Sequence, residues 1–289
     1  MTIRKTVIPA AGLGTRMLPA AKAIPKEMLP ILDRPTIQYV IEEAVEAGID
    51  QAILITSRQK RALAEHFQPN RELEERIKSA GKSRLLDSID TLCKKIHFTF
   101  VDQPQQRGLG DAVLQSRAAV GNEAFLCQLG DAVFSGNPLP SRQLVDAYKK
   151  FGASIIGLEE VGEDKVSRYG IIGGNQIEEG VWKLTSLVEK PQKDKAPSRL
   201  AIAARYILAP TIFDCLAQTN PGLGGEIQLT DALRLLLERE PIHGVILKAK
   251  RHDIGNPLDW LRTNLIFASS SPQMWKEIEP LLRKLLSHD

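Results

Sequence analysis

Residues 6–16 read TVIPAAGLGTR, and residues 25–30 read PKEMLP. A short apolar run gives way to small residues and glycines, so we expect a buried strand over 6–9 that enters a tight loop. Glycine-rich loops offer bare backbone N–H groups to anions, and two cations, Arg16 and Lys26, follow close behind. These segments therefore predict a strand leading into a loop that holds a polyphosphate.

Two common phosphate-binding motifs do not match this loop. A P-loop needs a lysine and a hydroxyl residue directly after its last glycine, but Gly14 is followed by Thr15 and Arg16. The dinucleotide fingerprint GxGxxG needs a third glycine at the position of Met17. The sequence therefore argues against an NAD-dependent oxidoreductase.

A third pattern, GxGTR followed by PK, matches at every position and resembles the sugar nucleotidyltransferases. Within that family the chain is similar to the bacterial UTP–glucose-1-phosphate uridylyltransferases (UDP-glucose pyrophosphorylases) from residue 3 to about 268. Further landmarks are PTIQY at 35–39, GLG at 108–110, LGD at 129–131, YG at 169–170, EKP at 189–191 and GEIQLTD at 225–231. The resemblance implies transfer of a uridylyl group from UTP to glucose 1-phosphate, giving UDP-glucose and pyrophosphate.

Length and composition bound the class of protein. The chain has 289 residues and a formal net charge of +3, a basic excess too small to predict a nucleic-acid partner. Its apolar runs are too short to span a membrane, and its start has no signal-peptide pattern, so we expect a cytoplasmic protein with no membrane partner. The three cysteines lie far apart and predict neither disulfides nor a zinc site.

Strands alternate with helices through the first half, which predicts a mostly parallel, Rossmann-like α/β sheet flanked by helices. The expected strands are 6–9, 51–56, 96–101 and 125–129, and the expected helices are 37–47 and 111–120. The second half is richer in strands and predicts a mixed extension that forms a second wall. Its expected strands are 154–161, 169–173, 181–188, 201–208 and 242–248, with helices at 228–238, 257–268 and 273–286.

These elements predict a single nucleotidyltransferase domain over residues 1–289. Its nucleotide-binding half covers about 1–135, its sugar-binding half about 136–256, and its C-terminal helices about 257–289. In open α/β sheets, ligands bind beyond the carboxyl ends of the strands. The loop after Pro9 and the aspartate after Leu129 both fall at such ends.

The resemblance also implies the roles of the site residues. Both reactants are anions, so the main tasks are charge neutralisation and alignment, and no covalent nucleophile is needed. Arg16 and Lys26 are the implied catalytic residues. The implied nucleotide contacts are Ala11, Gly12, Leu13, Gly14, Thr15, Glu27, Gln103 and Gly108, with the Gln103 amide on the uracil edge. The implied sugar-phosphate contacts are Gly170, Glu189 and Lys190.

The expected cofactor is Mg²⁺, with Asp131 and Asp253 as its implied ligands. The chain departs from the family pattern beside both aspartates. Ala132 stands where these enzymes often have a second aspartate, and Asn256 stands where they usually have a lysine. Ala204 replaces the usual glycine before Arg205, which would narrow the sugar pocket.

These departures leave alternatives to the uridylyltransferase reading open. One is a weakly active or inactive regulatory paralogue of that enzyme. Another is the same chemistry with a different sugar phosphate or with dTTP. The resemblance further implies a homo-oligomer, either a dimer or a tetramer, and the amphipathic C-terminal segment is the candidate for assembly.

Overall fold

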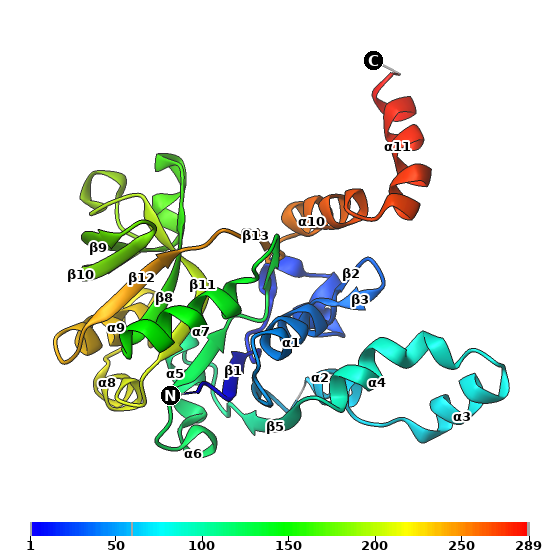
Figure 1. Cartoon of the computed structure of the whole chain (residues 1–289), viewed down its shortest axis with the longest axis horizontal. Helices are drawn as coiled ribbons and strands as arrows, with labels where there is room; N and C mark the ends of the chain where they lie inside the picture. Colours follow the sequence, from blue (N-terminus) through cyan, green and yellow to red (C-terminus); the bar gives the residue numbers. More distant parts are fainter. Residues whose placement is uncertain (1, 59, 288–289) are drawn as a thin grey trace.

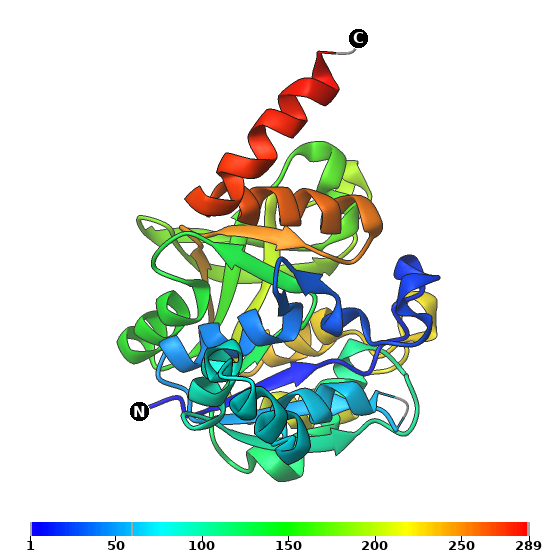
Figure 2. The same ribbon diagram turned by 90° about the vertical axis from the view of Figure 1, so that its right-hand side faces the viewer.

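The computed structural model describes residues 2–58 and 60–287. Nine strands in this part of the chain form one sheet in the order β5-β4-β1-β6-β11-β8-β12-β10-β9, with helices on both faces (Figures 1 and 2). The strands are β1 (Lys5–Pro9), β4 (Gln51–Thr56), β5 (His97–Asp102), β6 (Phe125–Gln128), β8 (Ser154–Glu160), β9 (Gly170–Glu178), β10 (Val181–Glu189), β11 (Leu200–Leu208) and β12 (Ile242–Ile246). Two short ribbons pair β2 (Pro30–Ile31) with β3 (Arg34–Pro35) and β7 (Ala132–Ser135) with β13 (Lys250–Asp253).

The sheet is parallel in its first half and mixed in its second. Strand β1 lies between β4 and β6 and runs parallel to both, and β5 runs parallel to β4. Strand β11 is antiparallel to both β6 and β8, and β12 enters parallel to β8 and antiparallel to β10. The predicted α/β sheet, parallel in its first half and with a mixed extension in its second, is therefore confirmed.

The helices divide between the two faces of the sheet. They are α1 (Thr36–Glu46), α2 (Arg61–Phe67), α3 (Arg71–Ser79), α4 (Asp87–Cys93), α5 (Leu109–Gln115), α6 (Arg117–Val120), α7 (Pro140–Phe151), α8 (Ile212–Gln218), α9 (Leu229–Leu237), α10 (Pro257–Ser269) and α11 (Pro272–Leu286). Side chains of α1, α2, α4 and α7 share one apolar core, and those of α5, α8 and α9 share the other.

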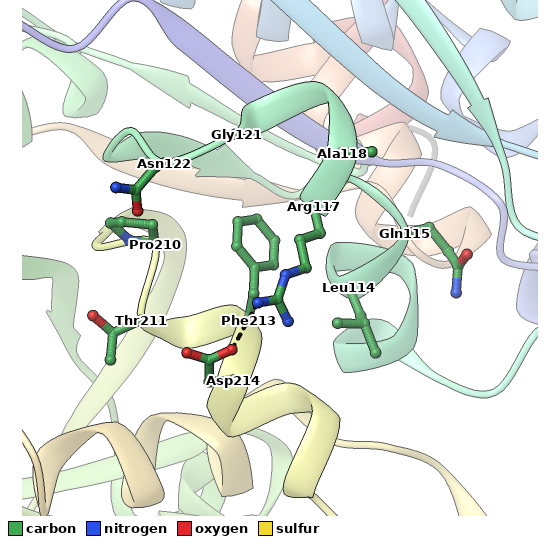
Figure 3. Close-up of a pocket in the computed structure, with 10 residues that line it drawn as sticks. All are labelled: Leu114, Gln115, Arg117, Ala118, Gly121, Asn122, Pro210, Thr211, Phe213 and Asp214. Carbon is green, nitrogen blue, oxygen red and sulfur yellow. Dashed lines mark hydrogen bonds and ion pairs between the residues drawn. The ribbon is translucent and has the colours of Figure 1, made fainter.

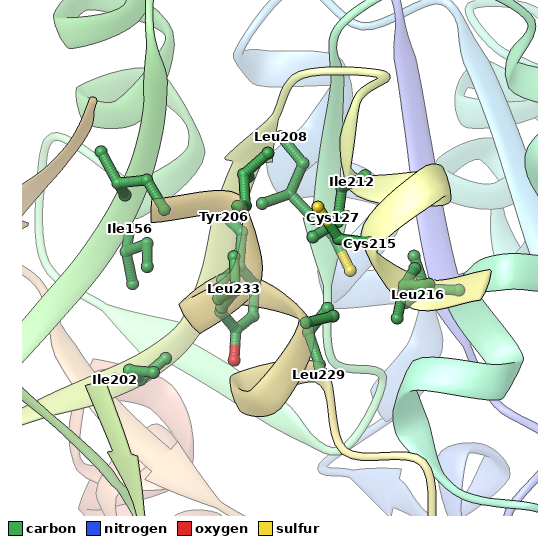
Figure 4. Packing of buried hydrophobic residues seen from close by; sticks show 14 of the residues in the cluster. Cys127, Ile156, Ile202, Tyr206, Leu208, Ile212, Cys215, Leu216, Leu229 and Leu233 are labelled. Atoms are coloured by element: carbon green, nitrogen blue, oxygen red, sulfur yellow. The ribbon is translucent and has the colours of Figure 1, made fainter. Parts of the chain in front are cut away.

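Successive strand residues supply these two cores in turn, as the pleat of a strand requires. In β1, Val7 belongs to the core under α5, α8 and α9, whereas Ile8 belongs to the core under α1 and α7. Figure 4 shows part of the core under α5, α8 and α9, where Tyr206 and Leu208 of β11 lie among side chains of α8 and α9. Because the middle of β1 is buried on both faces, its apolar residues Val7, Ile8 and Pro9 are consecutive rather than alternating with polar ones.

Several elements differ from the sequence prediction. The helix expected over 111–120 is broken at Ser116. The Ser116 hydroxyl donates to the carbonyl of Val113 at 2.7 Å, and such a side-chain bond to the preceding turn competes with the regular backbone hydrogen bonds of a helix. Helices α7 and α8 and the two short ribbons, β2–β3 and β7–β13, were not predicted. The strand expected over 169–173 extends to Glu178, because β10 pairs with it along most of its length.

Helix α11 projects away from the body of the molecule beyond α10 (Figures 1 and 2). None of its residues is buried. Within residues 2–58 and 60–287, no helix has the length and apolar character needed to cross a membrane.

Candidate active site

The ends of several strands open into one cavity of about 650 Å³. Strands β1, β4, β5 and β6 are parallel, so their carboxyl ends meet at the same edge of the sheet. The loop after β1 lines the cavity on one side, and residues that follow β5 and β6 continue the same wall. Residues of β9, β10, β11 and α9 form the opposite wall.

The structure brings nearly all of the predicted site residues to this cavity. Those that line it are Ala11, Gly12, Leu13, Gly14, Thr15, Arg16, Lys26, Glu27, Gln103, Gly108, Asp131, Gly170, Glu189 and Lys190. Asp253 is not among the lining residues, although it lies close enough to Asp131 to feel its charge. The two halves of the chain thus face each other across a shared space.

Lys26 and Asp131 form an ion pair, with 2.5 Å between Lys26 Nζ and Asp131 Oδ2. Burial raises the pKa of the Asp131 carboxyl, but the Lys26 ammonium outweighs that effect and holds the pKa below its usual value. Burial lowers the pKa of Lys26, and the charges of Asp131 and Glu27 more than restore it. Both groups are therefore charged at neutral pH in the cavity wall.

Asp253 reaches Asp131 through the β7–β13 ribbon. That ribbon sets Asp253 opposite Ala132, and the backbone N–H of Ile254 donates to the carbonyl of Asp131 at 3.1 Å. Burial raises the pKa of Asp253, and the negative charge of Asp131 raises it further. The carboxylates of Asp131 and Asp253 therefore repel each other, and a cation bound by both would offset that repulsion.

Arg16 lies against the turn that follows Asp253. A side chain at Gly255 would bring its Cβ within 2.9 Å of both Arg16 Nη2 and Asp253 Oδ1. The guanidinium therefore needs the absence of a side chain at this position to approach the carboxylate region. Gly255 thus allows Arg16, which follows the glycine loop after β1, to pack against the end of the β7–β13 ribbon.

Glu27 is 1% exposed and accepts a hydrogen bond from Lys60 Nζ at 3.0 Å. The same ammonium donates to the carbonyl of Ala10 at 2.6 Å. Burial raises the pKa of Glu27 and lowers that of Lys60, and each charge partly offsets the shift of the other. Lys60, which the sequence motifs did not indicate, fastens the start of the glycine loop to the PKEMLP segment.

Gln103 is 4% exposed and sits directly beyond the carboxyl end of β5. Its Nε2 donates to Asp111 Oδ2 at 2.7 Å and to the carbonyl of Gly108 at 3.3 Å. The amide nitrogen is thus engaged within the protein.

The opposite wall is organised around Glu189 and Lys190 at the end of β10. Glu189 Oε2 accepts from Thr230 Oγ1 at 2.6 Å, and Lys190 Nζ lies 3.1 Å from Glu189 Oε1. Lys190 has a φ of 44°, a left-handed conformation that is uncommon for a residue with a side chain and recurs at functional sites. A Cβ at Gly170 would come within 2.9 Å of Ile202 Cδ1 and 3.0 Å of Thr230 Oγ1, so these side-chain ends would have to shift to admit a larger residue.

A buried ion pair supports the segment that carries Asp131. Arg205 is completely buried on β11, and its guanidinium donates to both carboxylate oxygens of Glu43 on α1, at 2.9 and 2.7 Å. It also donates to the carbonyls of Leu129 at 3.3 Å and Ala132 at 2.9 Å. These two carbonyls flank Gly130 and Asp131, so the pair fixes the backbone on both sides of the carboxylate.

The three departures from the family pattern have identifiable surroundings. Ala132 and Ala204 are buried in one small apolar cluster with Phe134 and Ala249. Ala204 also has a φ of 58°, a conformation that favours the glycine usual at this position. Asn256 caps α10, since its Oδ1 accepts from the backbone N–H of Asp259 at 3.0 Å.

A second hollow of about 820 Å³ lies near α6 and the start of α8 (Figure 3). Arg117 and Asp214 form an ion pair across it, and each side chain is about half exposed. An exposed ion pair of this kind is weak because both charges stay hydrated, and neither charged residue that lines this hollow is buried. The cavity at the strand ends, with its buried charges, is the better candidate site.

Sequence reasoning missed several residues that shape the cavity. Arg251 lines it, forms an ion pair with Glu159 and stacks over the ring of Tyr169 with 4.4 Å between Cζ and the ring centroid. The sequence did not indicate Arg251, although it is only two residues from Asp253, because its partners Glu159 and Tyr169 lie in distant segments. The other lining residues not predicted include Gln106, Arg168, Tyr206, Glu226, Gln228 and Thr230.

Comparison with known proteins agrees with this geometry. The sequence matches the nucleotidyl transferase family over residues 5–270. It is 43% identical to the UTP–glucose-1-phosphate uridylyltransferase of Bacillus subtilis, across 99% of this chain and 98% of that protein. UTP–glucose-1-phosphate uridylyltransferase 2 of Staphylococcus saprophyticus is also 43% identical, and the match covers 98% of each chain.

Comparison with solved structures leads to the same family of enzymes. A UDP-glucose pyrophosphorylase complexed with UDP-glucose superposes with a TM-score of 0.86 at 42% identity, covering 93% of this chain and all of that one. The UTP-bound UGPase from Acinetobacter baumannii superposes with a TM-score of 0.91 at 36% identity, covering 98% of this chain and all of that one. The chain therefore belongs to the nucleotidyl transferase family and, within it, to the UTP–glucose-1-phosphate uridylyltransferases.

Proposed function

We infer that this protein transfers a uridylyl group from UTP to glucose 1-phosphate, giving UDP-glucose and pyrophosphate. The observation that carries this inference is the single cavity that joins the glycine loop, Arg16 and Lys26 on one wall to Glu189 and Lys190 on the other. The relatives named for this reaction match the chain over nearly its full length.

In this reaction an oxygen of the glucose 1-phosphate attacks the α-phosphorus of UTP. The new oxygen–phosphorus bond forms as the bond to the β-phosphate oxygen breaks, and pyrophosphate leaves. Arg16 would hold the β- and γ-phosphates, and Lys26 would stabilise the charge that develops at the α-phosphate. Lys190 would hold the phosphate of the sugar, and Glu189 would accept a hydrogen bond from a hexose hydroxyl.

We propose that the enzyme binds Mg²⁺ through Asp131 and Asp253. Their carboxylate oxygens are the hard ligands that Mg²⁺ prefers, and it is commonly held by one or two carboxylates together with substrate phosphates. No cluster of three or more Asp, Glu, His or Cys residues suited to a metal occurs among residues 2–58 and 60–287, so the nucleotide would supply further oxygen ligands. When bound, the ion would neutralise part of the triphosphate charge.

The decisive experiment is pyrophosphate release by the purified protein with a panel of nucleotides and sugar phosphates. We expect UTP with glucose 1-phosphate to be the best pair and EDTA to abolish turnover. Folded Asp131→Asn should lose at least about a hundredfold in turnover, on the order of 3 kcal/mol of transition-state stabilisation. Near-normal turnover by that variant would refute the metal assignment.

The same panel separates the alternatives. A catalytically weak regulatory paralogue would bind UTP yet release no pyrophosphate, and a thymidylyltransferase would prefer dTTP. Equal use of ATP and UTP would refute the uridylyl specificity even with the fold unchanged.

We further propose that the protein forms a homo-oligomer, a dimer or a tetramer, through α11. This helix projects from the body and carries the exposed apolar side chains Leu281, Leu285 and Leu286. Light scattering of the intact chain tests the proposal, since a monomer at micromolar concentration would contradict it. A cytoplasmic location is proposed on the ground that UTP is made and kept there.

A further inference from the structure

Asp111 is a buried carboxylate beside the nucleotide half of the cavity. It lies on α5 and is 1% exposed, and burying a charge is costly unless it is paired or fully hydrogen bonded. Three side chains donate to it: Gln103 Nε2 at 2.7 Å, Arg107 Nη2 at 2.8 Å and Gln115 Nε2 at 3.3 Å. Only Gln103 and Asp111 of these residues are buried, and of those two only Gln103 lines the cavity.

The chemistry of these partners fixes which way the Gln103 amide points. A carboxylate and a backbone carbonyl can only accept hydrogen bonds, so the NH₂ group must face Asp111 and Gly108. The amide oxygen, Oε1, is then turned away from both. No other residue in the described part of the chain donates to that oxygen, which leaves one acceptor free at the cavity wall.

We propose that Asp111 is a positioning residue that locks the Gln103 amide with its oxygen toward the base, and thereby selects uracil over cytosine. The inference rests on the proposed function, because it concerns the base of the nucleotide that this site would take. Uracil carries an N–H donor at N3, which complements Oε1. Cytosine carries a lone pair at N3, so the locked amide would set two acceptors against each other and leave both unsatisfied.

The test compares Asp111→Asn with the parent enzyme by catalytic efficiency with UTP and with CTP at fixed glucose 1-phosphate. In the variant, Arg107 would hold the oxygen of the new amide, and its NH₂ group would face Gln103. By turning over, the Gln103 amide gives up its long 3.3 Å bond to the Gly108 carbonyl but restores the short bond to residue 111, and it then presents a donor to the base. We expect the UTP-to-CTP ratio to fall at least about tenfold, with CTP use unchanged or increased.

Arg107→Ala is the matched control. It removes the ion pair to Asp111, and the Arg107 side chain is more than half exposed, but the carboxylate acceptor that faces Gln103 remains. Its UTP-to-CTP ratio should stay at the parent value, as should that of the conservative variant Asp111→Glu. If Asp111→Asn does not fold, Asp111→Ser serves in its place, since a hydroxyl can donate as well as accept and no longer locks the amide.

The outcomes separate this inference from the proposed function. A parent enzyme that uses UTP, together with a folded Asn or Ser variant that keeps the parent ratio, overturns the role of Asp111 alone. A parent enzyme with no activity on UTP overturns the proposed function instead. In that case, calorimetric binding of UTP and CTP to the parent and to Asp111→Asn still tests the locked amide.

Discussion

Ala204 holds a backbone conformation that a glycine adopts far more easily. Its φ is 58°, and it lies at the shift in register between Ile202 and Tyr206 where β11 passes β8. A left-handed conformation costs an L-residue roughly 1–2 kcal/mol because Cβ crowds the following carbonyl. Since Ala204 also lines the cavity, this chain keeps a strained residue in the wall of its site.

We therefore expect Ala204→Gly to leave the free energy of unfolding unchanged or to increase it. Relief of the left-handed strain offsets the lost methyl group and the greater freedom of glycine in the unfolded chain. Ala203→Gly is the control, because Ala203 is equally buried but has no positive φ, and it should lose about 1 kcal/mol or more. Urea denaturation measures both, and equal losses would mean that residue 204 is unstrained.

Individual site residues could be predicted wherever a contiguous motif carries them. Gly14, Arg16 and Lys26 fall in one short segment, and the structure places all three at the cavity. Lys60 escaped prediction because its function depends on reaching Ala10 and Glu27 across the fold. A lone lysine in a charged stretch gives no indication of such a contact in the sequence.

At the scale of elements, β12 contains a histidine whose environment opposes its charge. The ring of His243 stacks on Phe151 with 4.5 Å between centroids, and its Nδ1 is buried without a hydrogen-bond partner in the described part of the chain. Burial lowers the pKa of His243, and the charge of Lys183, its register partner on β10, lowers it further. The folded state therefore binds a proton at this site less readily than the unfolded chain does.

This difference predicts a contribution to pH-dependent stability. An unfolded histidine titrates near pH 6.5, so below that pH the unfolded state carries more protons and stability falls until the lower folded pKa is passed. His243→Phe removes the titration and keeps the stacking surface. Between pH 7.5 and 5.5, the parent should lose free energy of unfolding relative to the variant in urea denaturation. Because the two proteins are compared at each pH, other groups cancel; a constant difference would contradict the prediction.

Elements with a strong local pattern were predicted well. The strand over 51–56 has the predicted bounds, and α1 differs from its prediction by one residue at each end. Helix α7 could have been found, since Leu144, Val145 and Tyr148 share one face and Gly152 ends the helix in a left-handed conformation. The β7–β13 ribbon could not, because each strand has four residues and its partner lies more than a hundred residues away.

For the whole molecule, the Arg205–Glu43 pair joins parts of the chain that no single motif connects. It links β11 of the second half to α1 of the first, and through two carbonyls it holds the segment that carries Asp131. Both side chains are almost fully buried. Removing one partner of such a pair leaves an uncompensated charge in the interior, which typically costs about 3–5 kcal/mol.

We expect Glu43→Leu to lose about that much stability, whereas the double variant Glu43→Leu/Arg205→Leu should recover much of it. Turnover should not recover in the double variant, because the carbonyls of Leu129 and Ala132 then lose the guanidinium that donates to both. Thermal unfolding and pyrophosphate release, measured on the same preparations, check the two parts. A double variant with full turnover would show that the Asp131 segment keeps its position without Arg205.

The place of β12 in the sheet also bears on how the chain is made. Residues 242–246 fill the slot between β8 and β10, whose own residues end at 160 and 189. As the polypeptide leaves the ribosome, both neighbouring strands emerge on the order of seconds before the strand that joins them. During that interval each presents an open hydrogen-bonding edge, the feature by which nascent chains aggregate or recruit chaperones. The completion of this half of the sheet is thus timed by a strand translated well after both of its neighbours, and a transcript truncated before the β12 codons would yield a product with two unprotected edges.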